Sequence, residues 1–219
     1  MLKLQSYGVN GDLLKFIGDF LTGRVQRTKV GHSLSSSCCL NSGVVQGSCL
    51  GPLLFLLFIN DLPTIFDAEI TPKLYADDLK LYASIESNCD NVRLQENIDR
   101  LSNWARTWQL SISVKKCQTL HISRKRPENA LTSTFAIDSV PLPNVDKVSD
   151  LGVTIDGDLK FSAHVSLITH KAIARCKLIN KCFASRHTPT LVKAFIVYVR
   201  PILEYCAAVW SPYLVKDIE

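Results

Sequence analysis

Tyr75-Ala76-Asp77-Asp78 is the stretch that decides the fold, because it places two adjacent carboxylates between two short apolar, alternating runs. Leu74 and Leu79 flank the acidic pair, and alternation of this kind predicts two β-strands joined by a tight turn. The pair would then lie at the tip of a hairpin. A solvated turn without a ligand is one explanation, since Asp is a favoured turn residue. A metal site is the other, because adjacent carboxylates repel each other unless a cation or solvent screens them.

An earlier glycine-rich segment, residues 43–53, favours the metal site. Gly47 permits a tight turn and a close approach of the backbone to a ligand. Ser48 can cap a following helix, and Pro52 suits the first turn of that helix. The helix would be apolar on nearly every face, so we expect it to be buried beneath the sheet that carries the acidic pair.

Together these two segments resemble the nucleotide-pocket and catalytic motifs of reverse transcriptases from non-LTR retrotransposons, the LINE-like elements. Three later segments continue the resemblance. Residues 108–122 look like the palm segment with its lysine, 148–156 look like the hairpin that grips the primer, and 198–212 look like the end of the thumb. The resemblance covers essentially the whole chain. Two mild departures are Val45, where the family usually carries proline, and Ser113, where asparagine is usual.

The resemblance implies an α+β fold: a partial polymerase palm, with an antiparallel sheet and packed helices, followed by a helical thumb. The expected domains are a partial fingers and palm region over residues 1–145, a primer-grip-like hairpin over 146–158, and a basic helical thumb over 159–219.

The resemblance also assigns roles to particular residues. In the family, two Mg²⁺ ions held by carboxylates activate the primer 3′-hydroxyl and stabilise charge on the incoming dNTP, while an RNA template directs synthesis from a DNA primer. Asp77 would be a metal ligand and Asp78 an assisting or weaker one. Lys116 would be a general acid toward the departing pyrophosphate. The residues assigned to the nucleotide and template pocket are Gln46, Gly47, Ser48, Tyr75 and Ala76.

The amino-terminal end departs from the family pattern more seriously. In the family, a strand with a third metal-binding aspartate lies upstream of a helix, and residues 2–9 resemble the approach to that helix. Here the chain starts after the position of that strand. Two metal ions roughly 3.5–4 Å apart need carboxylates around both of them. We therefore expect a polymerase fragment that lacks the upstream segment and is inactive alone. The alternative is a catalytically dead remnant that at most binds nucleic acid through its basic thumb.

Positive charge is concentrated in residues 159–203, which contain eight Lys and Arg and no Asp or Glu, in a chain of net charge +5. A helix is predicted over 166–183, and a second should begin at Thr188-Pro189. A stretch of one sign suits a polyanion, although lysines that merely solvate a helical bundle would give the same pattern. The residues expected to contact nucleic-acid phosphates are Lys171, Arg175, Lys177 and Lys181.

The eight cysteines have no zinc-site spacing, which indicates that most of them are reduced core residues of an intracellular protein. The longest apolar run is too short to span a bilayer, and the amino terminus lacks a signal-peptide pattern. A nuclear or cytoplasmic location is expected, neither secreted nor membrane-bound.

Four further elements are predicted. They are a helix over 10–21, a strand pair over 24–31 and 38–45, an amphipathic helix from Asp90 and an exposed loop over 123–133. Packing against the sheet is expected for a stripe on the amphipathic helix, formed by Val92, Ile98, Leu101, Trp104, Ala105 and Trp108.

Overall fold

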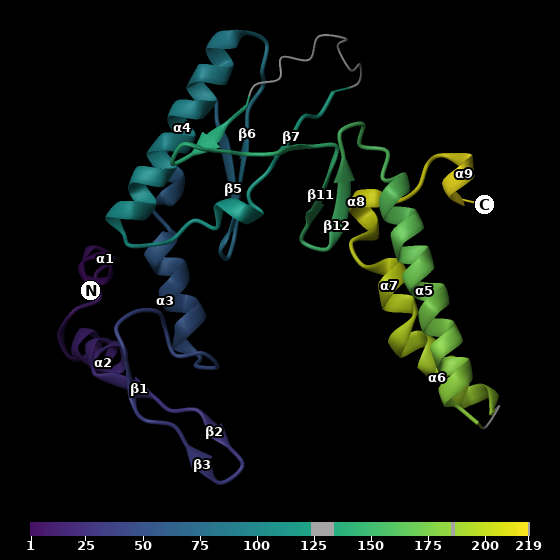
Figure 1. Cartoon of the computed structure of the whole chain (residues 1–219), viewed down its shortest axis with the longest axis horizontal. Helices are drawn as coiled ribbons and strands as arrows, with labels where there is room; N and C mark the ends of the chain where they lie inside the picture. Colours follow the sequence, from purple (N-terminus) through teal and green to yellow (C-terminus); the bar gives the residue numbers. More distant parts are fainter. Residues whose placement is uncertain (124–133, 185–186, 219) are drawn as a thin grey trace. The chain divides into compact units, whose positions relative to one another are not determined.

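The computed structural model describes residues 1–123, 134–184 and 187–218. The chain divides into two compact units, Met1–Ile112 and Ser113–Glu219 (Figure 1). The boundaries expected at residues 145 and 158 fall inside the second unit and stay predictions. The predicted loop over 123–133 lies outside the described residues from position 124 onward.

Helices form the core of the first unit. Its helical elements are α1 (Leu2–Ser6), α2 (Gly11–Leu21), α3 (Leu50–Ile59), the 3₁₀ turn η1 (Leu62–Ile65) and α4 (Asn88–Thr107). Leu4, Ile17 and Leu54, one from each of the first three helices, pack together as a buried cluster. The predicted helix over 10–21 is confirmed. Asn10 is its N-cap residue, but the Asn10 side-chain amide donates to the Gly8 carbonyl and makes no capping hydrogen bond to the helix.

The strands of the first unit pair two by two. β1 (Arg24–Gln26) pairs with β4 (Cys38–Leu40), β2 (Lys29–Val30) with β3 (Ser33–Leu34), and β5 (Thr71–Tyr75) with β6 (Asp78–Tyr82), all antiparallel. The predicted pairing of 24–31 with 38–45 is therefore confirmed over a shorter range. Helices and small sheets fit the α+β class, but within the described residues no sheet has more than two strands, so a larger antiparallel sheet is absent there.

The prediction that this helix, apolar on nearly every face, is buried beneath the sheet that carries the acidic pair is wrong. In α3, Leu54 and Ile59 are buried, but Leu53 and Leu56 are 53% and 50% exposed. The packing of Leu54 is against α1 and α2. These two short helices cover only one side of the α3 cylinder, so its opposite apolar side faces outward.

The amphipathic helix α4 begins two residues before the predicted Asp90. Ser87 is the N-cap, and Asp90 is the acidic partner in its capping box. The predicted stripe is correct at Ile98 and Ala105, which are buried, and wrong at Val92, which is 54% exposed. Asn91, Asn97 and Ser102 occupy the buried face as well, and polar residues on that face are not recognised by an apolar periodicity.

The second unit starts with short elements and ends with helices. η2 (Val114–Lys116) precedes β7 (Thr119–Leu120), which pairs in parallel with β10 (Asn144–Val145). β8 (Ala136–Ile137) pairs with β9 (Val140–Pro141), and β11 (Lys147–Asp150) with β12 (Val153–Asp156), both antiparallel. The helices are α5 (Ser162–Cys182), α6 (Thr188–Tyr198), α7 (Arg200–Glu204), α8 (Ala207–Trp210) and α9 (Val215–Ile218).

The β11–β12 hairpin lies beside α8 (Figure 1), and one buried cluster joins the hairpin to the helices that follow it. Val153 of β12, Ile168 of α5 and Trp210 of α8 are its centre. The Tyr205 hydroxyl also donates to the Leu151 carbonyl at the hairpin turn, at 2.9 Å. The predicted helix over 166–183 is confirmed and begins four residues earlier, at Ser162. The second predicted helix is α6, whose N-cap is His187 rather than Thr188.

The predicted core location of the cysteines is wrong. All eight are free thiols, and none is buried; only Cys117 and Cys176 are even partly covered. Their small size would fit a core, but Cys38 and Cys39 lie on the exposed strand β4, and Cys89 and Cys182 lie at exposed positions of α4 and α5. None of the described helices combines the length and apolarity that crossing a membrane requires.

Candidate active site and nucleic-acid surface

The acidic pair lies at the tip of the predicted hairpin. Tyr75 at the end of β5 pairs with Asp78 at the start of β6, and Ala76 and Asp77 form the turn between them. Ala76 has a φ of 51°, in the left-handed region. All four residues of the motif are exposed, so the structure presents both carboxylates outward. Their catalytic roles stay predictions.

The side chains at the tip are of the type that binds a divalent cation, but there are too few of them to form a complete site. Carboxylate oxygens are the ligands that Mg²⁺ takes in proteins, and Asp77 and Asp78 supply them. Among the residues that the structure describes, however, no three or more His, Cys, Asp or Glu side chains come together as a possible metal site. The pair alone is therefore an incomplete site for two ions.

Three of the predicted pocket residues, Gln46, Gly47 and Ser48, lie in the turn that precedes α3, whereas Tyr75 and Ala76 lie at the hairpin tip. Gln46 and Gly47 are exposed in this turn, and Gly47 has a φ of 78° that favours glycine. The Ser48 hydroxyl accepts a hydrogen bond from the Gly51 amide at 3.0 Å and donates one to the Val45 carbonyl at 2.7 Å. The predicted capping by Ser48 is thus confirmed, from the position just before the N-cap, Cys49.

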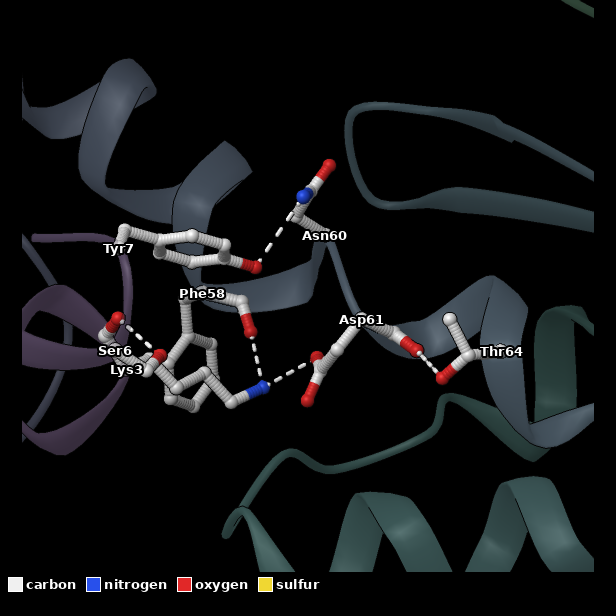
Figure 2. A network of polar contacts seen from close by, with 7 residues as sticks. All are labelled: Lys3, Ser6, Tyr7, Phe58, Asn60, Asp61 and Thr64. Atoms are coloured by element: carbon white, nitrogen blue, oxygen red, sulfur yellow. Dashed lines mark hydrogen bonds and ion pairs between the residues drawn. The ribbon is translucent and has the colours of Figure 1, made fainter.

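A largely covered lysine that sequence reasoning missed holds the other end of α3 (Figure 2). The Lys3 ammonium donates to the Phe58 carbonyl and to the Asp61 carboxylate, each at 2.5 Å, and the Lys3 side chain is only 11% exposed. It also lies 3.8 Å from the centroid of the Trp108 ring and 4.8 Å from that of Trp104. No local sequence signal marks Lys3, because its partners come from α3 and α4.

Lys3 stabilises α3 for two reasons. The Phe58 carbonyl is in the last turn of the helix, where carbonyls have no partner within the helix. A cation at that end also interacts favourably with the helix dipole. Tyr7 adds a second contact from the same part of the chain, since its hydroxyl accepts a hydrogen bond from the Asn60 amide at 3.2 Å. Lys3 therefore ties α1 to α3 and α4 at once.

Replacing Lys3 with methionine should lower the free energy of unfolding of the first unit by about 2 kcal/mol, because it removes charged hydrogen bonds and cation–π contacts while keeping the aliphatic volume. Urea unfolding followed by tryptophan fluorescence measures this, since Trp104 and Trp108 contact the ammonium. Lys15→Met is the matched control: Lys15 forms an exposed pair with Asp12, and its loss should cost less than about 0.5 kcal/mol. Equal losses for the two variants would contradict the clamp.

Lys116, the predicted general acid, lies in η2 and is exposed. It belongs to the second unit, whereas the acidic pair belongs to the first. Its amide donates to the Ser113 carbonyl at 2.9 Å, so Ser113 helps to shape the turn through its backbone. The role of Lys116 toward a triphosphate stays a prediction.

The α5 basic surface, defined by Lys171, Arg175, Lys177 and Lys181, carries unpaired charge. All four side chains are exposed, and none has a carboxylate partner in the described part of the chain. By contrast, Lys160 pairs with Asp158 at 3.0 Å and Arg200 with Glu204 at 2.6 Å.

The four side chains of this surface occupy two rows. At about 100° per residue, Lys171 and Arg175 lie on the same side of the buried Ala172, roughly 100° and 60° around the helix from it, and Lys177 and Lys181 lie toward the opposite side. The helix therefore offers two candidate rows for phosphates. A mainly apolar hollow lies between α5 and α6, lined in part by Ile179, Leu191 and Phe195.

His164 is a buried titratable group beneath this surface. It is 2% exposed, its Nδ1 accepts a hydrogen bond from the Thr154 amide at 3.2 Å, and its ring lies 5.2 Å from that of Trp210. Its Nε2 has no hydrogen-bond partner in the described chain. Burial, with a smaller effect from the charge of Lys171, lowers the pKa of His164. The neutral ring is therefore the form that fits between β12, α5 and α8.

Comparison with known proteins matches residues 3–155 to the family model described as reverse transcriptase (RNA-dependent DNA polymerase). The chain belongs to this family. The match includes both the acidic hairpin and the pocket turn, so the resemblance found in the sequence is confirmed. No solved structure matches this reverse transcriptase chain.

Three similar curated proteins come from Drosophila mobile elements. The probable RNA-directed DNA polymerase from transposon BS of Drosophila melanogaster is 31% identical over 88% of this reverse transcriptase chain. The RNA-directed DNA polymerase from mobile element jockey of Drosophila funebris is 29% identical over 91% of it, and that from transposon X-element of Drosophila melanogaster is 28% identical over 88%. In each case the match spans 22% of the relative's length.

Proposed function

We propose that this chain is the palm and thumb part of an RNA-directed DNA polymerase, which extends a DNA primer with dNTPs along an RNA template. The hairpin that presents Asp77 and Asp78 at its tip, inside the region matched to the family, is the observation that carries this proposal. The names of the relatives support the same reaction.

In this proposal each predicted site residue keeps one role. Bound Mg²⁺ ions would supply Lewis-acid activation of the primer hydroxyl and charge stabilisation at the phosphates. Asp77 and Asp78 contribute carboxylate oxygens to hold the ions, together with carboxylates from outside this pair. Lys116 protonates the departing pyrophosphate. The nucleotide and template pocket is formed by Gln46, Gly47, Ser48, Tyr75 and Ala76.

A second candidate function is nucleic-acid binding without catalysis. The α5 basic surface favours it, because exposed cations that have no carboxylate partner among the described residues remain available for phosphates.

In keeping with the incomplete metal site, the 219-residue chain alone is expected to give no extension product from primed RNA, Mg²⁺ and dNTPs.

The catalytic proposal is tested by exchanging residues 3–155 into the matching region of the Drosophila funebris jockey polymerase. The chimera should extend primed RNA, and Asp77→Asn should reduce kcat about 10³-fold, because losing a metal ligand removes several kcal/mol of transition-state stabilisation. Asp19→Asn, an exposed carboxylate on α2, is the control and should leave the rate unchanged. A folded chimera that binds primer–template without extending it would favour the binding function instead.

A further inference from the structure

The catalytic-type hairpin is attached to α4 on both sides. The chain that leads into β5 contacts α4 through Asp67, and the chain that leaves β6 contacts it through Glu86 and Ser87. The four residues of the hairpin tip are exposed. The position of the tip therefore depends on how its base is held.

Asn97 makes the attachment before β5. It is fully buried, at 0% exposure. Its Oδ1 accepts a hydrogen bond from the Asp67 amide at 3.0 Å, and its Nδ2 donates to the Asp67 carboxylate at 2.9 Å and to the Arg93 carbonyl at 2.8 Å. Arg100 adds an ion pair to the other oxygen of Asp67 at 2.5 Å. Both the backbone and the side chain of Asp67 are thus fixed by one helix.

This attachment leads directly into the strand. The Asp67 carbonyl accepts a hydrogen bond from the Ile70 amide at 3.0 Å, and Ile70, which is 5% exposed, is the residue before β5 begins at Thr71. After β6, the Asp90 carboxylate accepts hydrogen bonds from the amides of Glu86 and Ser87 at 3.0 and 2.8 Å. The two sides of the hairpin base are therefore bound to successive parts of α4.

We propose that Asn97 is a positioning residue for the Asp77–Asp78 pair and acts through Asp67. A strand rises about 3.3 Å per residue, so the tip lies roughly 17 Å from the start of β5. A tilt of about 10° at the base would move the carboxylates by about 3 Å, and displacements near 1 Å are enough to impair catalysis. The catalytic meaning rests on the proposed function, but the anchoring can be measured without any reaction.

A purely structural Asn97 and a positioning Asn97 predict different results. A buried amide whose hydrogen bonds only stabilise the first unit would, when replaced, loosen all of that unit together. A positioning residue would loosen β5 and β6 more than the helix that carries it. The quantity to measure is therefore the ratio of amide exchange rates in the hairpin to those in α4.

The experiment is hydrogen exchange by NMR on the full chain. Asn97→Leu, which keeps the volume and removes the hydrogen bonds, should raise this ratio at least about tenfold, whereas Asn103→Leu at an exposed position of the same helix should not. Asp67→Ala should raise the ratio as well. If Asn97 acts through Asp67, adding Asn97→Leu to Asp67→Ala should change the ratio no further.

Three outcomes would overturn the proposal: an unchanged ratio, a uniform acceleration across the unit, or additive effects of the two substitutions. If Asn97→Leu fails to fold, Asp67→Ala still decides, because Asp67 is partly exposed. In an active jockey chimera, Asn97→Leu should lower kcat and leave the KM for dNTP unchanged. An unchanged kcat would refute the positioning role alone, whereas an inactive parent chimera would count against the proposed function and leave the exchange result valid.

Discussion

The logarithm of nucleic-acid affinity should fall less steeply with the logarithm of salt concentration when all four basic residues of α5 are replaced by alanine. The expected reduction in slope is about three, for the combined substitution of Lys171, Arg175, Lys177 and Lys181. Each phosphate that a cation neutralises on a duplex contributes about 0.9 to this slope through counterion release, so the change corresponds to three or four contacts. Sequence preference should hardly change, because phosphate contacts carry no sequence information. Fluorescence anisotropy with a labelled RNA–DNA hybrid across a salt series measures the slope.

Two sets of variants sharpen this measurement. The matched control removes the same charge from exposed lysines elsewhere, at Lys15, Lys29, Lys115 and Lys147. Two double variants, Lys171 with Arg175 and Lys177 with Lys181, separate the two rows of the α5 basic surface. The row that contacts the nucleic acid should account for most of the change in slope. Equal slopes for the fourfold variant, the control and the wild type would instead indicate that the lysines only solvate the helices.

Acidification should destabilise the second unit through His164. In the unfolded chain this imidazole titrates near its usual value of 6.5, while burial lowers its pKa in the folded chain. Between the two values the unfolded state holds more protons, so stability falls as the pH falls. The stability that neutral His164 contributes is complete above pH 6.5 and is lost as the pH drops through the pKa of His164 in the folded chain. Protonation also removes the acceptor of the Thr154 amide.

Urea unfolding from pH 5 to 8 measures this effect in protein labelled with 5-fluorotryptophan. The Trp210 resonance reports the second unit, whereas Trp104 and Trp108 report the first. His164→Gln should remove the acid-sensitive part and leave an otherwise flat profile. His170→Gln, at an exposed position of the same helix, should keep the wild-type profile. Equal acid sensitivity in both variants would exclude His164 as its source.

Local sequence patterns were sufficient for the hairpin and most helices. The acidic tip follows from alternation on either side of Asp77, and α5 follows from its length and the absence of breakers. Ser48 was also recognised as a cap, because that chemistry depends only on neighbours along the chain. These features have in common that their causes lie within a few residues of each other.

Features that depend on distant partners could not be predicted. The apolar sequence of α3 specifies burial but not which elements cover it, so the exposure of Leu53 and Leu56 was missed. Lys3 resembles any surface lysine until Phe58, Asp61 and the α4 tryptophans surround it. Asn97 interrupts an apolar stripe and gains its meaning only from Asp67, thirty positions away.

The left-handed conformation of Ala76 has a consequence for how variation at this position should be understood. A side chain in that region costs about 1–2 kcal/mol, more for β-branched residues, and glycine or asparagine relieves the cost. Replacing Ala76 with glycine should therefore relieve strain in the turn, and replacing it with valine or isoleucine should increase it. The residue that fits at position 76 is therefore set by the backbone of the turn as well as by any contact with a nucleotide.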